Sequence, residues 1–430
     1  MASAPGNWSD LRAYDRGGSD VIRCGEPAMN GSGRFPGTIV IVSHVVHYKS
    51  ADRLFAYAPY AREIEIWADM FDKVLIAAPC REQEPPGDCA LIDRNNFSIA
   101  PQRELGGETL AAKAKLLFLL PALSWDLARA IRRGEAVHVR CPGNLGLIGS
   151  ILAPLFSKHL VAKFAGQWNS SPGEPWSNRF QRAVLRSRWW ANPVTVYGRW
   201  PGEPKHIIPF FNSVMTNEQI ARGRAAKRGP NELRHVLFVG RLSRAKNVDV
   251  LLQALGILRG EGLAFTASIA GEGPESASLR HLSNRLGLEH SVEFKGGISF
   301  ERIVELLEHS GVVVLASETE GWPKAIVEGM AFGLVAIGSQ VGLVPEILGE
   351  GRGLLVPPGN VKALAGSLRS VLSAPEKYVE MRARATSWAG HYSIESLRDS
   401  LLSLLAQSWD LPLKENPQSA PIASAACVHD

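Results

Sequence analysis

The sequence predicts an α/β fold of two Rossmann-like, doubly wound domains that face each other across a cleft. A chain of 430 residues is too long for one ordinary core and suits two domains. Short apolar runs alternate with helix-like segments, which is typical of a parallel sheet covered by helices on both faces. This alternation stops once, in a polar and basic stretch at 211–230, and restarts at His235. Ligands of such folds bind at the carboxyl ends of the strands, so the cleft is the expected site.

The first predicted domain covers residues 37–205, and we expect the Gly-rich segment 1–36 before it to be disordered. The run at 38–43 lacks polar alternation and is bounded by turn residues, so it predicts a fully buried strand. The elements predicted after it are a helix at 55–70, a strand at 73–78, a helix at 108–133 broken near Pro121, a strand at 136–140, a helix at 145–157 and a strand at 159–164.

Residues 206–232 are predicted to form a linker and hinge, and the second predicted domain covers 233–390. A C-terminal helix at 391–410 leads into a Pro- and Ala-rich tail, 411–430, that we expect to be disordered. The predicted strands of the second domain are at 235–239, 265–270, 291–294, 312–316, 334–338 and 354–356, with amphipathic helices between them.

The composition excludes several classes of protein. Hydrophobic residues make up 45% of the chain and charged residues 21%, as in an ordinary globular protein. The five cysteines lack the paired spacing of a zinc site or a disulfide framework, which favours a reducing compartment. Because no signal-peptide core and no run of ~18 apolar residues occurs, we expect a cytoplasmic protein without transmembrane helices. The net charge of +5 is spread along the chain, so we expect no nucleic-acid partner.

One stretch, FQRAVLRSRWW at 180–190, combines arginine with tryptophan, and Tyr197, Arg199 and Trp200 follow it. This combination suits a membrane headgroup layer or an anionic glycolipid acceptor. A solvated helix face whose tryptophans pack into the domain would have the same composition. A peripheral contact with the inner membrane surface therefore stays open beside the plainer interpretation.

The segment GRLSRAKN, 240–247, directly follows a predicted strand of the second domain. Gly240 lets the backbone turn tightly, and Arg241 and Lys246 then bring two cations to the carboxyl edge of the sheet. The planar fork of arginine and the movable charge of lysine suit a pyrophosphate. Two surface cations that cap a helix start are the alternative.

A second strand-end segment, AGEGPES at 270–276, carries two glycines in a turn before a helix. Gly271 and Gly273 resemble part of the dinucleotide fingerprint G-x-G-x-x-G, but Ser276 occupies the position of the third glycine. A tight strand-to-helix turn needs such glycines for its geometry alone. The segment therefore disfavours a dehydrogenase.

The most informative segment is SETEGWPKAIVEGMAFG, 317–333, because it combines a polar loop with a helix start. Pro323 suits the first turn of a helix, and backbone N–H groups at 321–324 would form an anion site there. Glu320 and Glu328 can accept hydrogen bonds from the hydroxyl groups of one elongated ligand. A capping glutamate and a solvent-facing glutamate are the alternative for this segment alone.

Together, the three strand-end segments describe a site for a nucleotide diphosphate that carries a polyol. The C-terminal half resembles the retaining GT-B glycosyltransferases of the family 4 type, or glycosyl transferases group 1. That group includes sucrose synthases and bacterial exopolysaccharide and lipopolysaccharide glycosyltransferases. Its signature is two glutamates separated by seven residues, and Glu320 and Glu328 match it. The resemblance covers about 235–390, with matching stretches at 240–246, 271–274, 294–297 and 342–347.

The resemblance implies a GT-B fold and a metal-independent hexosyltransferase whose only co-substrate is the nucleotide-diphosphate sugar, without a further cofactor. It implies that Arg241 and Lys246 hold the diphosphate, that Glu320 orients the sugar, and that Glu328 fixes the ribose. Two departures from the family pattern, Asn247 and Leu334, remove no charged group. The catalytic candidates are Glu320, Lys246 and Arg241, and the donor-binding candidates are Gly240, Gly271, Gly273, Gly296, Gly321, Trp322, Pro323, Lys324 and Glu328.

The N-terminal half matches the family less closely, because the loop after its first strand reads SHVVHYKSADR instead of a Gly-Gly turn. The acceptor-side candidates are His44, His47, Lys49 and Arg140, with Arg53 beside them. Ordinary loop packing is the alternative for each of them. We expect no metal site, because the His-x-x-His spacing has no third ligand and no Asp-x-Asp pair occurs.

The function implied by the resemblance is transfer of a hexosyl unit, with retention, from a nucleotide-diphosphate sugar to a hydroxyl group. The segments HVRCPGN, FAGQWNS and VYGRW are similar to those of bacterial exopolysaccharide transferases. They favour a saccharide or a lipid-linked saccharide as the acceptor, in bacterial surface polysaccharide synthesis. A nucleotide-sugar epimerase of the same architecture and a non-catalytic nucleotide-sugar-binding protein remain open as alternatives.

Overall fold

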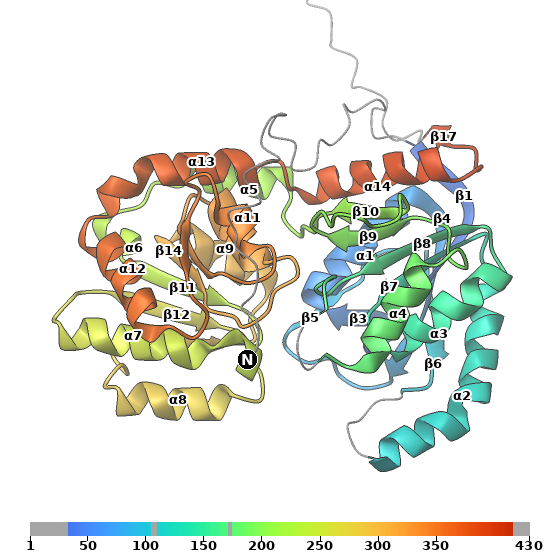
Figure 1. Cartoon of the computed structure of the whole chain (residues 1–430), viewed down its shortest axis with the longest axis horizontal. Helices are drawn as coiled ribbons and strands as arrows, with labels where there is room; N and C mark the ends of the chain where they lie inside the picture. The colour runs from blue at the N-terminus through green and yellow to red at the C-terminus, as the bar shows by residue number, and fades with distance from the viewer. Residues whose placement is uncertain (1–32, 105–109, 171–173, 416–430) are drawn as a thin grey trace, which may run out of the picture.

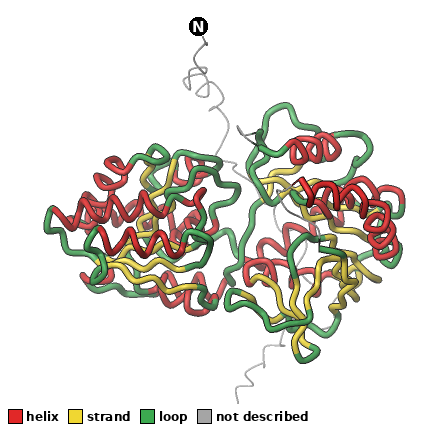
Figure 2. The backbone as a smooth tube through the Cα atoms, turned by 90° about the horizontal axis from the view of Figure 1, so that it is seen from below, coloured by secondary structure: helices red, strands yellow, loops and turns green. Residues whose placement is uncertain are grey.

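The computed structural model describes residues 33–104, 110–170 and 174–415, which form two halves joined side by side (Figure 1). In each half the strands lie between helices, as Figure 2 shows from a second direction. The strand order of the first sheet is β10-β9-β8-β7-β1-β4-β2-β3-β5, with β6 pairing to β4 and β17 pairing to β1. The order of the second sheet is β13-β12-β11-β14-β15-β16, and all its pairs are parallel. The predicted fold class is therefore confirmed.

The elements of the first half and the connection after it run from β1 to α6, with groups of strands separated by helices. They are β1 (Gly33–Val42), β2 (His47–Ser50), β3 (Arg53–Tyr57), α1 (Ala58–Met70), β4 (Phe71–Arg81), β5 (Cys89–Leu91), β6 (Phe97–Gln102), α2 (Leu110–Ile131), β7 (Ala136–Cys141), α3 (Asn144–Leu152), η2 (Ala153–Leu155), β8 (His159–Phe164), α4 (Trp176–Arg186), β9 (Val194–Tyr197), β10 (Ile207–Phe210), α5 (Asn217–Ala225) and α6 (Pro230–Leu233).

The second half repeats the alternation, and its strands lie where the apolar runs predict them. Its elements and the chain end are β11 (His235–Val239), η3 (Arg244–Lys246), α7 (Val248–Gly260), β12 (Thr266–Ala270), α8 (Ser276–Arg285), β13 (Val292–Gly296), α9 (Phe300–Glu308), β14 (Val312–Leu315), α10 (Lys324–Ala331), β15 (Val335–Ser339), α11 (Val344–Leu348), β16 (Leu354–Val356), α12 (Val361–Ser373), η4 (Pro375–Tyr378), α13 (Val379–Ala389), α14 (Ile394–Ser408) and β17 (Lys414–Glu415).

The position of β1 at the centre of the first sheet explains its uninterrupted apolar run. It pairs in parallel with β4 on one side and β7 on the other. All four residues from Ile39 to Val42 are fully buried, because helices cover both faces of the sheet.

The loop predicted at 43–53 is instead largely a hairpin, in which β2 pairs with β3. The backbone groups of β2 are paired on both sides, because β2 also pairs in parallel with β4 at His47 and Tyr48. The helix predicted to break near Pro121 is also continuous in α2, although Figure 1 shows that α2 bends along its length. Proline removes one hydrogen bond and bends a helix, but packing against neighbouring helices can hold both parts together.

The segment 206–232, expected to be a linker, carries three elements of its own. β10 extends the first sheet by pairing with β9, and α5 lies against α9 and α10 of the second half. The side chain of Thr216 accepts a hydrogen bond from the backbone N–H of Gln219, so α5 begins with a capping box. The polar composition that predicted a linker is therefore that of a capped surface helix.

The end of the chain returns to the first half, where α14 contacts α1 (Figure 1). Trp409 packs against the rings of Phe35 and Phe71, and its Nε1 donates to the Leu160 carbonyl at 3.1 Å. Residues 414–415 then pair with 33–34 as β17 and β1. Residues 33–36 and 411–415, both expected to be disordered, are thus ordered by each other, and the rest of both predicted tails lies outside the described residues.

Candidate functional site

Two loops at the carboxyl edge of the second sheet are joined by side chains that the sequence predicts as a pair of site residues. Lys246 Nζ lies 2.6 Å from Glu320 Oε1, and the hydroxyl of Ser317 donates to the same oxygen at 2.6 Å. Asn247 Nδ2 donates to the carbonyl of Ala316 at 3.2 Å, which ties the loop after β11 to the loop after β14. The structure therefore brings Lys246 and Glu320 into direct contact across 74 positions of sequence.

The glycines after β11 and β12 allow the backbones of two loops to touch. A side chain at Gly271 would overlap the carbonyl oxygen of Gly240, and one at Gly273 would overlap that of Leu242. Gly271 N donates to the carbonyl of Gly296 at 2.8 Å, so the loop after β13 joins the same layer. The structure therefore supports the geometric explanation for Gly271 and Gly273, since a Cβ atom would not fit at either position.

Gly321 lies where the two halves of the chain touch. A Cβ at this position would meet the ring of Tyr197 at 3.0 Å and the carbonyl carbon of Gly166 at 3.2 Å. Both neighbours belong to the first half of the chain. The start of the segment 321–324 therefore forms part of the contact between halves rather than an open loop.

The helix start at α10 offers fewer free N–H groups than the sequence suggested. Pro323 has no N–H, and the N–H of Lys324 donates to the carbonyl of Trp322 at 2.9 Å. The anion site expected at 321–324 is therefore reduced to the groups before Pro323. The indole of Trp322 also turns inward, where it packs among Tyr197, Phe211, Trp388 and Tyr392 at ring distances of 5.3 to 6.5 Å.

Glu328, on α10, is a carboxylate in an unusual environment. It is 9% exposed, and within the described residues its side chain makes no hydrogen bond or ion pair. Burial raises the pKa of Glu328, although the charges of Lys324 and Arg62 oppose the shift. It lines a small cavity together with Asn212, Ser213, Met215, Trp322, Lys324, Val327, Ala331 and Tyr392. A buried carboxylate without a partner is costly, and such groups are enriched at functional sites.

Two polar groups beside Glu328 also lack partners within the described part of the chain. They are Trp322 Nε1 and Asn212 Oδ1, and both residues line the same cavity. The cavity measures about 10 Å³, room for one water-sized group. Its carboxylate, N–H donor and amide oxygen thus make a small polar spot in a lining that is mostly apolar.

Arg241 is exposed at the start of its loop, and Tyr57 of the first half lies within the reach of its charge. Partial burial and the negative charges of Asp88 and Glu328 raise the pKa of Tyr57, while Arg241 opposes that shift. The charges of Arg241 and Glu328 therefore both act on Tyr57. The structure gathers Arg241, Lys246, Glu320 and Glu328 along the edge that faces the first half.

The acceptor-side candidates are not brought together in the same way. His47 is fully buried against the ring of Tyr60, and burial lowers its pKa to about 4. Lys49 forms an ion pair with Asp52 in the hairpin at 3.0 Å, and Arg53 lies over the ring of Phe55 in the same hairpin. These three side chains thus have structural contacts of their own.

His44 keeps an exposed side chain and lies against the turn at Gly143, at the end of β7. Partial burial and the charge of Arg140 lower the pKa of His44, so the imidazole is largely neutral at pH 7. A neutral imidazole can both donate and accept hydrogen bonds. Of the four acceptor-side candidates, His44 is the one whose side chain is free to meet a ligand.

Arg140 belongs to a buried cluster of charges that the sequence analysis missed. Its guanidinium binds the carboxylate of Glu63, which also pairs with Lys163 Nζ at 3.0 Å and accepts a hydrogen bond from Asn212 Nδ2 at 3.0 Å. Burial alone would raise the pKa of Glu63, but Arg140 and Lys163 outweigh it and hold that pKa well below its usual range. The sequence signal for this cluster was Glu63, because a charged residue at a position of the apolar stripe of α1 indicates a buried partner.

Lys324 connects this cluster to the neighbourhood of Glu328. Burial lowers the pKa of Lys324, while the charges of Glu63 and Glu328 oppose that shift. Asn212 contributes to both places, because it binds Glu63 and lines the cavity at Glu328. The cluster thus lies where the two halves meet, because Lys324 belongs to the second half and Glu63 to the first.

The described residues contain no group of three or more His, Cys, Asp or Glu side chains arranged to hold a metal ion. Within the same residues, no helix has the length and apolar character that crossing a bilayer requires.

Comparison with known proteins gives a family for part of the chain. Residues 220–388 match the family model of the glycosyl transferases group 1. An uncharacterised glycosyltransferase of Haemophilus influenzae is 29% identical over 179 residues, which is 40% of this chain and 49% of that protein. The putative colanic acid biosynthesis glycosyltransferase WcaL of Salmonella typhimurium is 32% identical over 140 residues. The match covers 31% of this chain and 34% of that protein. The chain thus matches half or less of the length of these curated relatives.

Solved structures resemble the whole fold at low sequence identity. Anabaena HepE, in complex with UDP and glucose, has a TM-score of 0.65 and 17% identity, with 86% of this chain and 99% of that one covered. Sucrose-phosphate synthase of Thermosynechococcus elongatus has a TM-score of 0.63 and 19% identity, with coverage of 87% and 98%. These similarities establish the fold.

The fold is that of the GT-B glycosyltransferases, with two Rossmann-like sheets. Within it, residues 220–388 are related to the glycosyl transferases group 1, with relatives in bacterial polysaccharide synthesis.

The buried Glu328 leads to a prediction for Glu328→Gln. Because the pKa of Glu328 is raised in the folded protein, its ionised form costs stability once the pH rises through that folded value. The neutral amide removes this cost, so the variant is expected to be more stable by about 1 kcal/mol at neutral pH. Thermal melting should show a rise of a few degrees, largest at neutral pH and vanishing below the ordinary carboxyl range.

Glu318→Gln, an exposed change in the loop before Gly321, serves as the control and should leave the melting temperature unchanged. If Glu328→Gln melts at or below the wild-type temperature at neutral pH, the carboxylate has a stabilising partner and this interpretation of its environment is wrong.

Proposed function

We propose that the protein is a retaining hexosyltransferase that moves a sugar from a nucleotide diphosphate to a hydroxyl group of a saccharide or lipid-linked saccharide in the cytoplasm. The observation that carries the proposal is the partnerless carboxylate of Glu328 beside the joined loops of Lys246 and Glu320. A site for a nucleotide sugar needs carboxylates for hydroxyl groups and cations for a diphosphate at one sheet edge. The relation of 220–388 to group 1 glycosyltransferases supports the same assignment.

In the proposed reaction, negative charge develops on the departing diphosphate as the glycosidic bond breaks. Lys246 and Arg241 would stabilise that charge, and the cleft would strengthen their effect by excluding water. The Lys246 ammonium is held by Glu320 in the free protein, so it is already positioned at the edge of the site. These two cations supply the charge that a metal ion would otherwise bring, and we propose that none is needed.

Glu320 and Glu328 would bind the two ends of the donor. Glu320 lies beside Lys246, at the diphosphate end, and would orient the sugar through its second oxygen. Glu328, whose carboxylate has no partner among the described residues, would accept the ribose hydroxyls at the other end. Retention at the anomeric carbon follows most simply if the acceptor attacks from the face that the diphosphate leaves, with a departing phosphate oxygen taking the acceptor proton.

The donor is expected to raise the melting temperature of the protein, since a ligand that binds only the folded state stabilises it by about 2.7 kcal/mol at a hundred times its Kd. A panel of nucleotide-diphosphate sugars, led by UDP sugars because UDP occupies the HepE structure, should contain one that does so. With a saccharide acceptor, the same donor should release nucleoside diphosphate and form a glycoside of unchanged anomeric configuration.

Three results separate this proposal from its alternatives. If a donor stabilises the protein but no acceptor of a broad panel causes release of nucleoside diphosphate, the protein is a non-catalytic nucleotide-sugar-binding protein. A change in the donor sugar without any acceptor would indicate an epimerase. Loss of activity in EDTA, restored by a divalent cation, would contradict the metal-independent part of the proposal.

A further inference from the structure

Helix α4 is oriented with its polar side toward the protein and its aromatic side toward solvent. Gln181 and Arg182 are each 1% exposed, whereas Trp176 is 74% exposed and Phe180 is 46% exposed. Leu185 is buried beside Gln181 and Arg182, so the inner side of α4 is mostly polar, whereas a surface helix of a globular protein normally turns an apolar stripe toward the core. Exposed aromatic side chains in a group are a mark of an interaction surface.

A network of polar contacts fixes this orientation. Arg182 binds the carboxylate of Glu174, and its second nitrogen donates to the hydroxyl of Ser170 at 3.0 Å. Arg186 Nε lies 2.8 Å from Glu203 Oε2, and Trp168 Nε1 donates to the same carboxylate at 2.9 Å.

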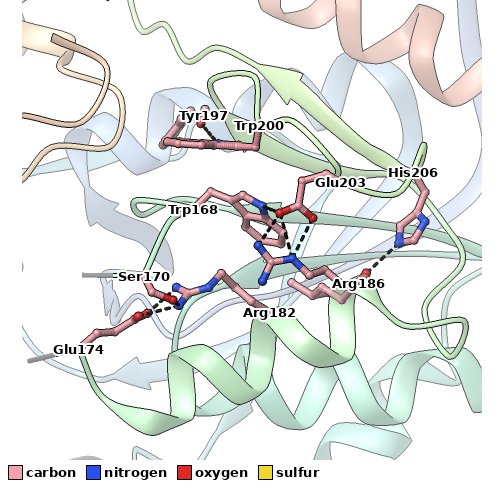
Figure 3. A network of polar contacts seen from close by, with 10 residues as sticks. Trp168, Ser170, Glu174, Arg182, Arg186, Tyr197, Trp200, Glu203 and His206 are labelled. Atoms are coloured by element: carbon pink, nitrogen blue, oxygen red, sulfur yellow. Dashed lines mark hydrogen bonds and ion pairs between the residues drawn. The ribbon is translucent and has the colours of Figure 1, made fainter. Parts of the chain in front are cut away.

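Figure 3 shows both guanidinium groups on the same side of α4, directed at these partners. On that inner side, Gln181 Nε2 also approaches Cys141 Sγ at 3.0 Å. Turning the aromatic side inward would break two ion pairs and leave the largely buried carboxylates of Glu174 and Glu203 without these partners, which is costly. The aromatic side of α4 is therefore held toward solvent.

The neighbouring helices carry further exposed apolar side chains. Helices α2, α3 and α4 lie side by side on one side of the first sheet (Figure 1), with contacts between α2 and α3 and between α3 and α4. The indole of Trp189 reaches α3, where its Nε1 donates to the carbonyl of Ile151 at 3.1 Å. We call the following exposed side chains the aromatic face: Phe118, Trp125, Leu155, Trp176, Phe180 and Trp189.

The charges around the aromatic face are largely positive. Asp126 on α2 is held in an ion pair by Arg103 at 3.2 Å, and Glu174 is buried with Arg182. Two exposed carboxylates near these helices also have partners, because Glu104 pairs with Arg81 at 2.6 Å and Glu135 accepts a hydrogen bond from the Thr38 N–H. The exposed cations on and beside α2 and α4 are Arg129, Arg132, Arg133, Lys158, Arg179 and Arg188.

We propose that the aromatic face docks the protein on a membrane surface rich in anionic lipid. Aromatic side chains insert at the level of the headgroups, and arginine and lysine side chains bind the anionic phosphates beside them. A second copy of the chain fits this surface poorly, because two positive faces would be brought together. The charge of the face thus selects the bilayer as its occupant.

Docking by this face would bring the edge of the cleft near the lipid. α3 and α4 follow β7 and β8, so both helices begin at the carboxyl edge of the first sheet, where the cleft lies. The loop between β8 and α4 reaches the second half, since Thr319 Oγ1 donates to Gln167 Oε1 at 2.8 Å. If the proposed sugar transfer holds, a lipid-linked acceptor would meet the site without leaving the bilayer.

The test is sedimentation of the full chain with vesicles of phosphatidylcholine, with and without phosphatidylglycerol, at low and high salt. The wild type is expected to bind only the anionic vesicles, and less at high salt. Trp176→Ser with Phe180→Ser should lower the partition coefficient about tenfold, since each aromatic ring loses apolar burial in the interface. Arg129→Glu with Arg188→Glu should lower it by a similar factor.

Val379→Ser and Arg285→Glu are matched controls, because both positions are exposed in the second half of the chain, and they should bind as the wild type does. Melting curves of all variants should coincide, since the substituted side chains are exposed. The proposal is overturned if the wild type ignores anionic vesicles or if the double variants bind them unchanged. It is also overturned if the aromatic face instead mediates self-association, seen as a dimer that Trp176→Ser with Phe180→Ser abolishes. Vesicle binding needs neither donor nor acceptor, so an inactive enzyme would leave this result intact.

Discussion

Lys246→Ala is expected to lower kcat for sugar transfer by about 10²–10³-fold, the loss seen when one preorganised group that stabilises transition-state charge is removed. The ammonium of Lys246 lies 2.6 Å from Glu320 and is 26% exposed, so it can turn to a diphosphate without leaving the site. The measurement is release of nucleoside diphosphate at saturating donor. Glu320→Ala, which removes the group that holds Lys246, should cause a comparable loss.

Arg244→Ala is the matched control, because it removes an exposed cation two residues earlier in the same loop. Its rate should stay near that of the wild type. Lys246→Arg should recover part of the activity, since it keeps the charge but not the geometry. Full activity of both Lys246→Ala and Glu320→Ala in folded protein would show that the site is assigned to the wrong residues.

Glu63→Gln is expected to destabilise the protein by about 3 kcal/mol, because it leaves Arg140 and Lys163 buried without their shared counter-ion. Burial already lowers the pKa of Lys163 to about 8, so this lysine can release its proton and keep the cost at the lower end of the usual range. Thermal melting should show a fall on the order of 10 °C, given about 2–4 °C per kcal/mol for domains of this size.

Acid titration gives a second measurement of the same cluster. The folded pKa of Glu63 lies below its unfolded value, so its contribution is present above the ordinary carboxyl range and is lost as the pH falls through the folded pKa. The difference between wild type and Glu63→Gln should therefore shrink in strong acid. Glu65→Gln, on the same helix and outside the cluster, should change the melting temperature little. Equal melting of Glu63→Gln and wild type would contradict a stabilising role for the ion pairs.

The secondary structure of the second half was predictable because its pattern is local. The apolar run at 235–239 is strand β11 residue for residue, and the motif that follows it supplies Lys246 at the sheet edge. Parallel strands place their carboxyl ends at one edge, so residues that follow successive strands meet without further information. Trp322 shows the limit of this reasoning, because its inward rotation depends on Trp388 and Tyr392 from α13 and the turn after it.

The sequence by itself determined two doubly wound sheets, the three strand-end segments and the pair of glutamates, because alternation and spacing along the chain encode them. The tertiary structure alone decided which charged side chains are buried and which aromatic ones are exposed. Glu63 meets Arg140 and Asn212 from 77 and 149 positions away, and no local pattern records such distances. The same holds for α4. Its Arg182 and Arg186 face inward because Glu174 and Glu203 lie there and neutralise them. Burial of a charge depends on its partner, and the fold brings that partner from elsewhere in the chain.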